Sequence, residues 1–237
     1  MVDKNIIDMK IYICHYPKLT DRIESLIPSL SKNGFHDIEI IYGIDRYDIN
    51  EKHFSIFSND ILLKKEREKY IDFVDFAYNI LSKPAEMANF LTHLEIWDKI
   101  TKSSQKYCLV LEDDVVIIDD NFTEKWNKYL KNIPDNLDIA YLNEGCDLTV
   151  KDTLGLDLID DKIWYNCFIK ESRTCCAYII SSDFCSKIIN FIKLNPVIFA
   201  VDHELNFIQK KINANVYWTY PCIFKEGSGD IYKSSLR

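Results

Sequence analysis

The sequence has very little glycine, only 6 residues in 237. It contains neither G-x-x-x-x-G-K-[ST] nor G-x-G-x-x-G. These motifs build the phosphate loops of P-loop NTPases and of Rossmann dinucleotide-binding proteins, where glycines let the backbone approach the phosphates. Both classes are therefore excluded, and a bound nucleotide would need another kind of phosphate site.

Cysteine pairs of the C-x-x-C type are also missing, although the chain has 8 cysteines. Their absence excludes a zinc ribbon and a thioredoxin-like redox site. Most of the cysteines lie in apolar runs such as YCLVL, NCFIK and CCAYII, where a free thiol packs as a small hydrophobic group. We expect reduced, buried thiols without chemistry, including Cys175 and Cys176.

The first residues, MVDKNIIDMK, lack the apolar core of a signal peptide, and no window approaches the roughly 20 apolar residues of a membrane span. Long runs of Lys and Arg are absent, and the formal net charge of −8 argues against a nucleic-acid partner. We therefore expect a cytoplasmic protein without a transmembrane segment. An anchor on a separate or removed segment stays open.

Hydrophobic residues make up 47% of the chain, which is ample for a core. Lys10–His15 has the pattern of a buried strand, and Ile38–Tyr42 that of a second one. The residues between them, from Thr20 to Gly34, have helical spacing, with Asp21 and Glu24 placed as in a capping box. This strand–helix–strand order favours an α/β fold with a mainly parallel central sheet flanked by helices.

The rest of the chain continues as one domain, residues 1–237, without repeats or linkers. We expect a helical insertion at 46–83, a long loop at 143–162 and a mobile polar tail at 225–237. Further helices are predicted from Pro84 and at Phe122–Ile133, Asp183–Lys193 and Asp202–Ile212, and further strands at Tyr107–Leu111, Leu137–Leu142, Cys176–Ser181 and Asn215–Thr219.

Three adjacent acids follow the apolar strand YCLVL: Glu112, Asp113 and Asp114. Unpaired carboxylates beside a core are costly, so they either lie at a solvated turn or bind something positive. The alternating ligands and central glycine of an EF-hand are missing. In open parallel sheets ligands bind at the carboxyl ends of strands. The triplet therefore favours a divalent cation that bridges phosphate oxygens, with a plain acidic turn as the alternative.

Several motifs in order resemble glycosyltransferase family 25, which includes bacterial lipopolysaccharide galactosyltransferases and collagen β-galactosyltransferases. The helix NFLTHLEIWDKI precedes the strand that ends in Glu-Asp-Asp, and IYICHYPKLTDR and YGIDR match the start of the family pattern. Tyr141-Leu142-Asn143, AYIIS at 177–181 and Ala200-Val201-Asp202 follow in family order. The resemblance covers nearly the whole chain.

The sequence departs from the family pattern at several positions. His15 stands where the family usually has Asn, and Arg46 where it usually has Gly. Ala85 and Ala88 replace small glycines before the His helix. Near the C-terminus Lys225 and Glu226 occur where the family often carries Gln or His. A ligand or phosphate contact is therefore either missing or replaced by Lys225.

The resemblance implies a GT-A glycosyltransferase fold, a UDP-hexose donor (glucose or galactose) and a divalent ion, Mn²⁺ or Mg²⁺. It makes Asp114 the first metal ligand, with Glu112 as a second ligand. Glu112 or Asp113 would otherwise reach the ribose or a metal-bound water. Hard carboxylate oxygens suit these ions.

Other donor-binding positions implied by the resemblance are His15, Asp45, Lys83, Asn143 and Lys225. Asp45 would accept from the uracil or ribose, or simply form a turn. Lys83 would meet a phosphate or sugar hydroxyl, or remain a surface lysine. His93 is either a hydrogen-bonded core histidine or a residue that orients the acidic loop.

The family is inverting, so the implied reaction is a direct displacement on the UDP-sugar by an acceptor hydroxyl. Asp202 is the expected general base and also a good helix N-cap, with Glu204 as the second choice. The acceptor is a glycan or a hydroxylated protein, and a homodimer stays open. Two rivals remain: a non-catalytic nucleotide-sugar-binding relative and a metal-dependent phosphoryl-transfer enzyme.

Overall fold

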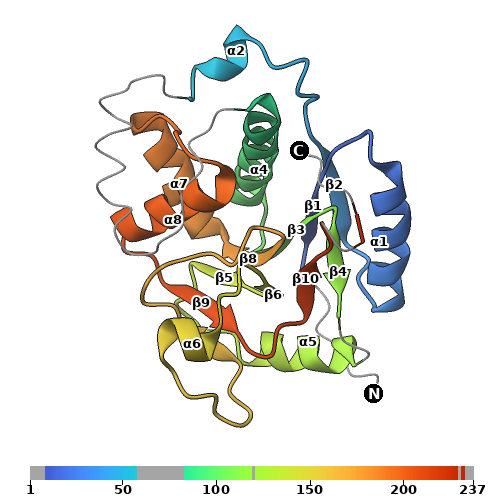
Figure 1. The fold of residues 1–237 in the computed structure, drawn as a ribbon, viewed down its shortest axis with the longest axis vertical. Coiled ribbons are helices and arrows are strands. Elements are labelled where there is room, and N and C mark those ends of the chain that lie inside the picture. The colour runs from blue at the N-terminus through green and yellow to red at the C-terminus, as the bar shows by residue number, and fades with distance from the viewer. Residues whose placement is uncertain (1–8, 58–82, 119–120, 229–230, 233–237) are drawn as a thin grey trace.

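A computed structural model describes residues 9–57, 83–118, 121–228 and 231–232 (Figure 1). Its central feature is a seven-stranded sheet in the order β2-β1-β3-β8-β5-β9-β7. The strands are β1 (Ile11–His15), β2 (Ile38–Tyr42), β3 (Tyr107–Glu112), β5 (Ile139–Tyr141), β7 (Trp164–Asn166), β8 (Ala177–Ser181) and β9 (Val216–Thr219).

The predicted α/β class is confirmed, and the sheet is mixed. β1 pairs parallel with both β2 and β3, and β5 pairs parallel with β9. β8 is antiparallel to both of its neighbours, and β7 is antiparallel to β9. Five strands thus share one direction and two oppose it. Strand hydrophobicity predicts burial but carries no information about direction, which is why β8 was not recognised as antiparallel.

Helices cover both faces of this sheet, so the domain has three layers (Figure 1). Because side chains alternate along a strand, Tyr12 and Cys14 of β1 pack on one face, while Ile11 and Ile13 pack on the other. The first face is covered by α4 (Pro84–Lys102), α7 (Ser182–Leu194) and α8 (Val201–Lys211). The second is covered by α1 (Thr20–Lys32) and α5 (Phe122–Lys131).

The start of α1 differs from the predicted capping box. Leu19 occupies the N-cap without a side-chain cap, and Asp21 lies in the first turn, where its charge favours the helix dipole. The end is as predicted, because Gly34 adopts φ 88 just after the C-cap. Helix α4 begins at Pro84, whose missing N–H costs nothing in the first turn.

A second, three-stranded sheet lies beside the acidic triplet, in the order β4-β10-β6. It consists of β4 (Val115–Ile117), β6 (Asn143–Glu144) and β10 (Phe224–Glu226). Lys225 and Glu226, the first residues of the tail predicted to be mobile, instead pair with Val116 and Val115 of β4. This pairing could not be predicted, since FKE is too short for a strand pattern.

Two predicted irregular segments contain short helices. Helix α2 (Glu51–Phe54) falls in the predicted insertion, of which residues 58–82 lie outside the described part of the chain. The predicted loop at 143–162 contains β6 and the helix α6 (Val150–Leu154). Within the described residues, no helix combines the length and the apolar character that crossing a membrane requires.

Candidate functional site

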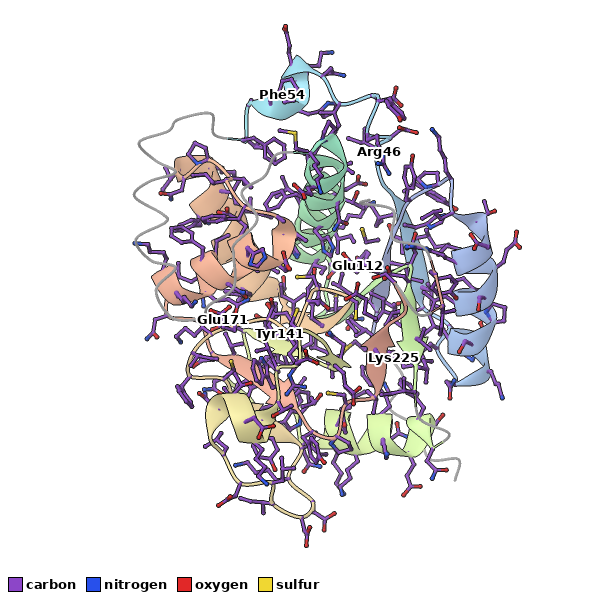
Figure 2. The ribbon with its side chains drawn as sticks, in the orientation of Figure 1. Arg46, Phe54, Glu112, Tyr141, Glu171 and Lys225 are labelled. Atoms are coloured by element: carbon purple, nitrogen blue, oxygen red, sulfur yellow. The ribbon has the colours of Figure 1, made fainter. Side chains whose placement is uncertain are left out.

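The acidic triplet lies in a cleft between the two sheets. Glu112 ends β3, and Asp113 and Asp114 form the turn into β4. The cleft walls come from the end of β1, the segment after β2, the first turns of α4 and the end of β10. Figure 2 shows Glu112 near the middle of the molecule, with Arg46 above it and Lys225 below.

Asp113 is the hydrogen-bonding centre of this cleft. Its Oδ2 accepts from His15 Nδ1 at 2.7 Å and from the backbone N–H of Tyr16 at 3.0 Å. Its Oδ1 accepts from Arg22 Nη1 at 2.6 Å. Since a carboxylate only accepts, His15 carries its proton on Nδ1. Asp113 therefore ties the β1–α1 connection to the end of β3, and His15 reaches the cleft as predicted.

Asp114 is the acid with an unused oxygen. Its Oδ2 accepts from Arg22 Nη1 at 3.3 Å, whereas its buried Oδ1 has no partner among the described residues. Burial, and then the neighbouring charge of Glu112, raises the pKa of Asp114 to about 8. A positive group at Oδ1 would stabilise the ionised form of Asp114, which burial and the charge of Glu112 disfavour.

Glu112 is held by two residues of α4. Its Oε1 accepts from Asn89 Nδ2 at 3.1 Å and lies 3.3 Å from His93 Nε2. Burial by itself would raise the pKa of Glu112, but the bonds from His93 and Asn89 lower the pKa overall. Glu112 therefore stays ionised beside Asp114, whose pKa is raised.

His93 combines the two roles proposed for it. The side chain is fully buried, and its Nδ1 lies 2.8 Å from the hydroxyl of Tyr178, which also accepts from Trp97 Nε1 at 3.0 Å. Because Glu112 can only accept, His93 donates from Nε2 and its Nδ1 takes the Tyr178 proton. His93 is thus a core residue that also orients Glu112.

Three charged residues of the cleft were not identified as site residues from the sequence: Arg22, Arg46 and Glu226. Arg22 and Arg46 bring positive charge to the cleft, and Asp-Arg in the first motif was the available signal for Arg22. Glu226 lies opposite the triplet because Gly227 N donates to Asp114 O at 2.8 Å. A Cβ on Gly227 would approach that oxygen to 2.7 Å, so this contact requires glycine. Burial, and then the charges of Glu112 and Asp202, raise the pKa of Glu226.

Four predicted donor-binding residues do not line this cleft. Lys225 lies in β10, where its backbone pairs with Val116 of β4. Asp45 forms the turn that was its alternative, with Oδ1 accepting from Tyr47 N at 3.0 Å and Oδ2 paired with Lys18. Lys83 is 60% exposed, with its ammonium 4.0 Å from Glu86. Asn143 is fully buried and donates to the backbone oxygen of Arg173 at 2.7 Å, so it supports a loop.

The two predicted bases on α8 have different environments. Glu204 is fully buried, and its Oε2 accepts the backbone N–H groups of Ile198 at 3.0 Å and Phe199 at 3.1 Å. It therefore holds the segment before the helix. Asp202 is 30% exposed and lies in the first turn; Ala200, not Asp202, is the N-cap, because the helix begins one residue earlier than predicted.

The described residues contain no group of three or more His, Cys, Asp or Glu side chains arranged to hold a metal ion. A closed, all-protein metal centre is therefore absent from this part of the chain. The free Oδ1 of Asp114 beside Glu112 nevertheless suits a hard cation that takes its remaining oxygens from a diphosphate and water, as Mg²⁺ commonly does. The residues thus fit a shared ion and not a resident one.

The chain matches the model of glycosyltransferase family 25 (LPS biosynthesis protein) over residues 9–205. Among solved structures it is similar to the galactosyltransferase LgtC in complex with donor and acceptor sugar analogs. The two sequences are 10% identical, the match covers 94% of this chain and 88% of that chain, and the TM-score is 0.46. It is also similar to a glycosyltransferase involved in glycosylation of the major capsid of PBCV-1, with 10% identity, 93% of both chains covered and a TM-score of 0.44. No curated protein matches the chain.

Arg22→Met should lower the free energy of unfolding by about 3 kcal/mol, because it leaves Asp113 and Asp114 as buried acids without their cation. Urea denaturation followed by circular dichroism measures this loss. Lys32→Met removes an exposed cation from the same helix and should cost less than about 1 kcal/mol. Equal losses in the two variants would contradict the buried ion pair.

His93→Ala should destabilise the protein by about 2 kcal/mol or more, because it opens a cavity and removes one hydrogen-bond partner each from Tyr178 and Glu112. The exposed His36→Ala is the matched control and should leave the melting temperature nearly unchanged. A His93→Ala protein with wild-type melting temperature would show that the observed network contributes nothing to stability.

Proposed function

Since the chain belongs to glycosyltransferase family 25, we propose that it moves a hexose from a UDP-sugar to a hydroxyl of a glycan or protein acceptor. The observation that carries this proposal is the buried, unpartnered Oδ1 of Asp114 in a cleft that also contains two arginines. Such a cleft suits a ligand that is both anionic and metal-binding, as a diphosphate is.

The diphosphate would lie between the acidic turn and Arg46, because Arg22 is already bound to Asp113 and Asp114. Asp114, with Glu112 beside it, would hold Mn²⁺ or Mg²⁺ against the phosphate oxygens. When bound, such an ion neutralises the negative charge that develops on the departing UDP. Arg46 lines the same cleft and would add positive charge on its other side.

His15 and Asn89 would orient the donor from the cleft walls. Asp113 fixes the proton of His15 on Nδ1, so a neutral His15 offers Nε2 as an acceptor for a ribose or sugar hydroxyl. Asn89 is fixed by its bond to Glu112. These side chains are positioned before the donor arrives, which reduces the entropy cost of binding.

Asp202 is the proposed general base. It takes the proton of the acceptor hydroxyl while that oxygen bonds to the anomeric carbon, and the bond from this carbon to UDP breaks on the opposite side. Its side chain is partly exposed, and its charge raises the pKa of Glu226, so it lies within electrostatic range of the cleft. The first turn of a helix also favours the ionised form that a base requires.

UDP with Mn²⁺ should raise the melting temperature, whereas UDP with EDTA should raise it much less, because Asp114 needs a cation to hold the diphosphate. A proton competes with the cation for Asp114, whose pKa is about 8, so the gain should weaken as the pH falls from 8 to 6.

Asp114→Asn is expected to lose most of the gain and its pH dependence while keeping the fold. Glu124→Gln, which removes an acid from α5 outside the cleft, is the matched control. Normal UDP–Mn²⁺ stabilisation in Asp114→Asn would show that this turn is not the metal site.

Asp202→Asn should leave UDP–Mn²⁺ binding and donor hydrolysis largely intact while transfer to an acceptor falls by about a hundredfold or more. The base contacts only the attacking hydroxyl, on the side of the anomeric carbon opposite the diphosphate. Comparing rates of UDP release with and without acceptor separates the two reactions. Transfer within a few-fold of wild type would exclude Asp202 as the base.

A further inference from the structure

A second hollow adjoins the proposed donor cleft and shares Glu226 and Ser228 with it. It lies between the segment that follows β6, the start of α6, and the turn between β9 and β10. Its cavity volume is about 650 Å³, within the usual range of about 300–1,000 Å³ for small-molecule sites. Size and position suit the acceptor of a transfer reaction.

Arg173 lines this hollow and is only 2% exposed. Its Nη1 lies 3.2 Å from Thr219 O, 3.4 Å from Asn143 O and 2.8 Å from Cys222 Sγ, and its guanidinium carbon lies 4.4 Å from the Trp218 ring centroid. Within the described residues no carboxylate is close enough to form an ion pair with it. Burial lowers the pKa of Arg173 even though the charge of Glu144 opposes this effect. A buried guanidinium without an ion-pair partner is costly, which points to an anion supplied from outside.

The unused donors of Arg173 are the ones that bind anions best. Nε and Nη2 are buried without a hydrogen-bond partner, while the protein uses only Nη1. Nε–H and one Nη2–H project in parallel from the same edge of the guanidinium. That edge matches the two oxygens of a carboxylate or phosphate in a bidentate pair. This Nε–H and Nη2–H edge, called the fork below, is therefore left for a ligand.

The loops around Arg173 hold it firmly. A Cβ on Gly145 would lie 1.9 Å from Arg173 O, so the two loops pack backbone against backbone. Cys146, Asp147 and Thr174 adopt positive φ values of 54, 55 and 84, which non-glycine residues adopt at a cost. These contacts fix the backbone from which the Arg173 side chain extends.

The other charged side chains of the hollow are Glu144, Asp147, Lys225 and Glu226. Three acids would repel a polyanion, but carboxylates accept hydrogen bonds from sugar hydroxyls. A sugar with many hydroxyls and a single anionic group satisfies both the acids and the fork.

We propose that this hollow is the acceptor site and that it selects an acceptor sugar bearing a carboxylate or phosphate, bound side-on by Nε and Nη2 of Arg173. The inference rests on the proposed hexosyl transfer and names the chemical class of its acceptor. Arg173 is then a specificity-determining residue that holds the acceptor while Asp202 takes its proton.

Binding of three probes tests this: glucuronate, glucose 6-phosphate and glucose, titrated by ligand-observed NMR at constant ionic strength with UDP and Mn²⁺ present. At least one anionic probe should bind about tenfold or more tightly than glucose, as expected for a charged bidentate pair. The tighter of the two identifies the group as carboxylate or phosphate. Equal binding of all three probes to the wild-type protein would overturn the proposal and leave Arg173 as a structural cation.

Arg173→Gln should abolish the preference for the anion while retaining UDP–Mn²⁺ stabilisation. Lys151→Gln, which removes an exposed cation from α6, should retain the preference. A folded Arg173→Gln protein that still prefers the anion would refute the assignment. If this variant does not fold, the comparison of probes on the wild-type protein decides alone.

UDP–Mn²⁺ stabilisation is measured in the same samples, which separates the two proposals. If the protein prefers the anionic probes but does not bind UDP, the proposed hexosyl transfer is wrong, whereas the anion site remains. If the protein binds UDP but does not prefer the anionic probes, only the assignment of the acceptor is wrong.

Discussion

The buried ion pair between Arg22 and Asp113 is the interaction on which the cleft depends. It joins α1 to the turn after β3, two elements that are 91 residues apart in the chain. Both side chains are almost fully buried, so neither charge is stable without the other. His15 and the backbone of Tyr16 complete the environment of Asp113, and the position of the whole first connection follows from that one carboxylate.

The three adjacent acids are divided among three roles by their neighbours. Asp113 has a structural role, because both of its carboxylate oxygens accept hydrogen bonds from within the protein. Glu112 is kept ionised by His93 and Asn89 of α4, and Asp114 retains a free oxygen in the cleft. Three carboxylates in sequence would repel one another if all faced the same space. Their separation by Arg22 and His93 is what makes one of them available for a ligand.

The small sheet joins the two parts of the molecule that we connect to function. β10 lies between β4, which follows the acidic turn, and β6, which leads into the loop beside Arg173. Glu226 at the end of β10 lines both hollows. A displacement of this strand would therefore alter both hollows together, and would couple the two binding sites that we propose there.

Periodicity in the sequence determined the fold class. Helix α7, strands β1, β2 and β3 and the start of α4 were predicted within a residue or two, because their apolar spacing and the helix-initiating Pro84 are local signals. The order of the motifs also identified the family correctly. The chemistry of the acidic triplet was visible for the same reason, since three acids after a buried strand stand out.

Only the tertiary structure decided which residues meet. Four predicted donor-binding residues have suitable chemistry but lie outside the cleft: Asp45, Lys83, Asn143 and Lys225. Glu226 and Arg173, in contrast, reach the two hollows through pairings of distant segments. The direction of β8 and the burial of Glu204 were equally invisible, because a side-chain pattern records neither strand orientation nor the partner of a carboxylate. Local sequence fixes what each element is. Long-range packing fixes which charges remain without a partner, and those charges are the ones left to bind a ligand.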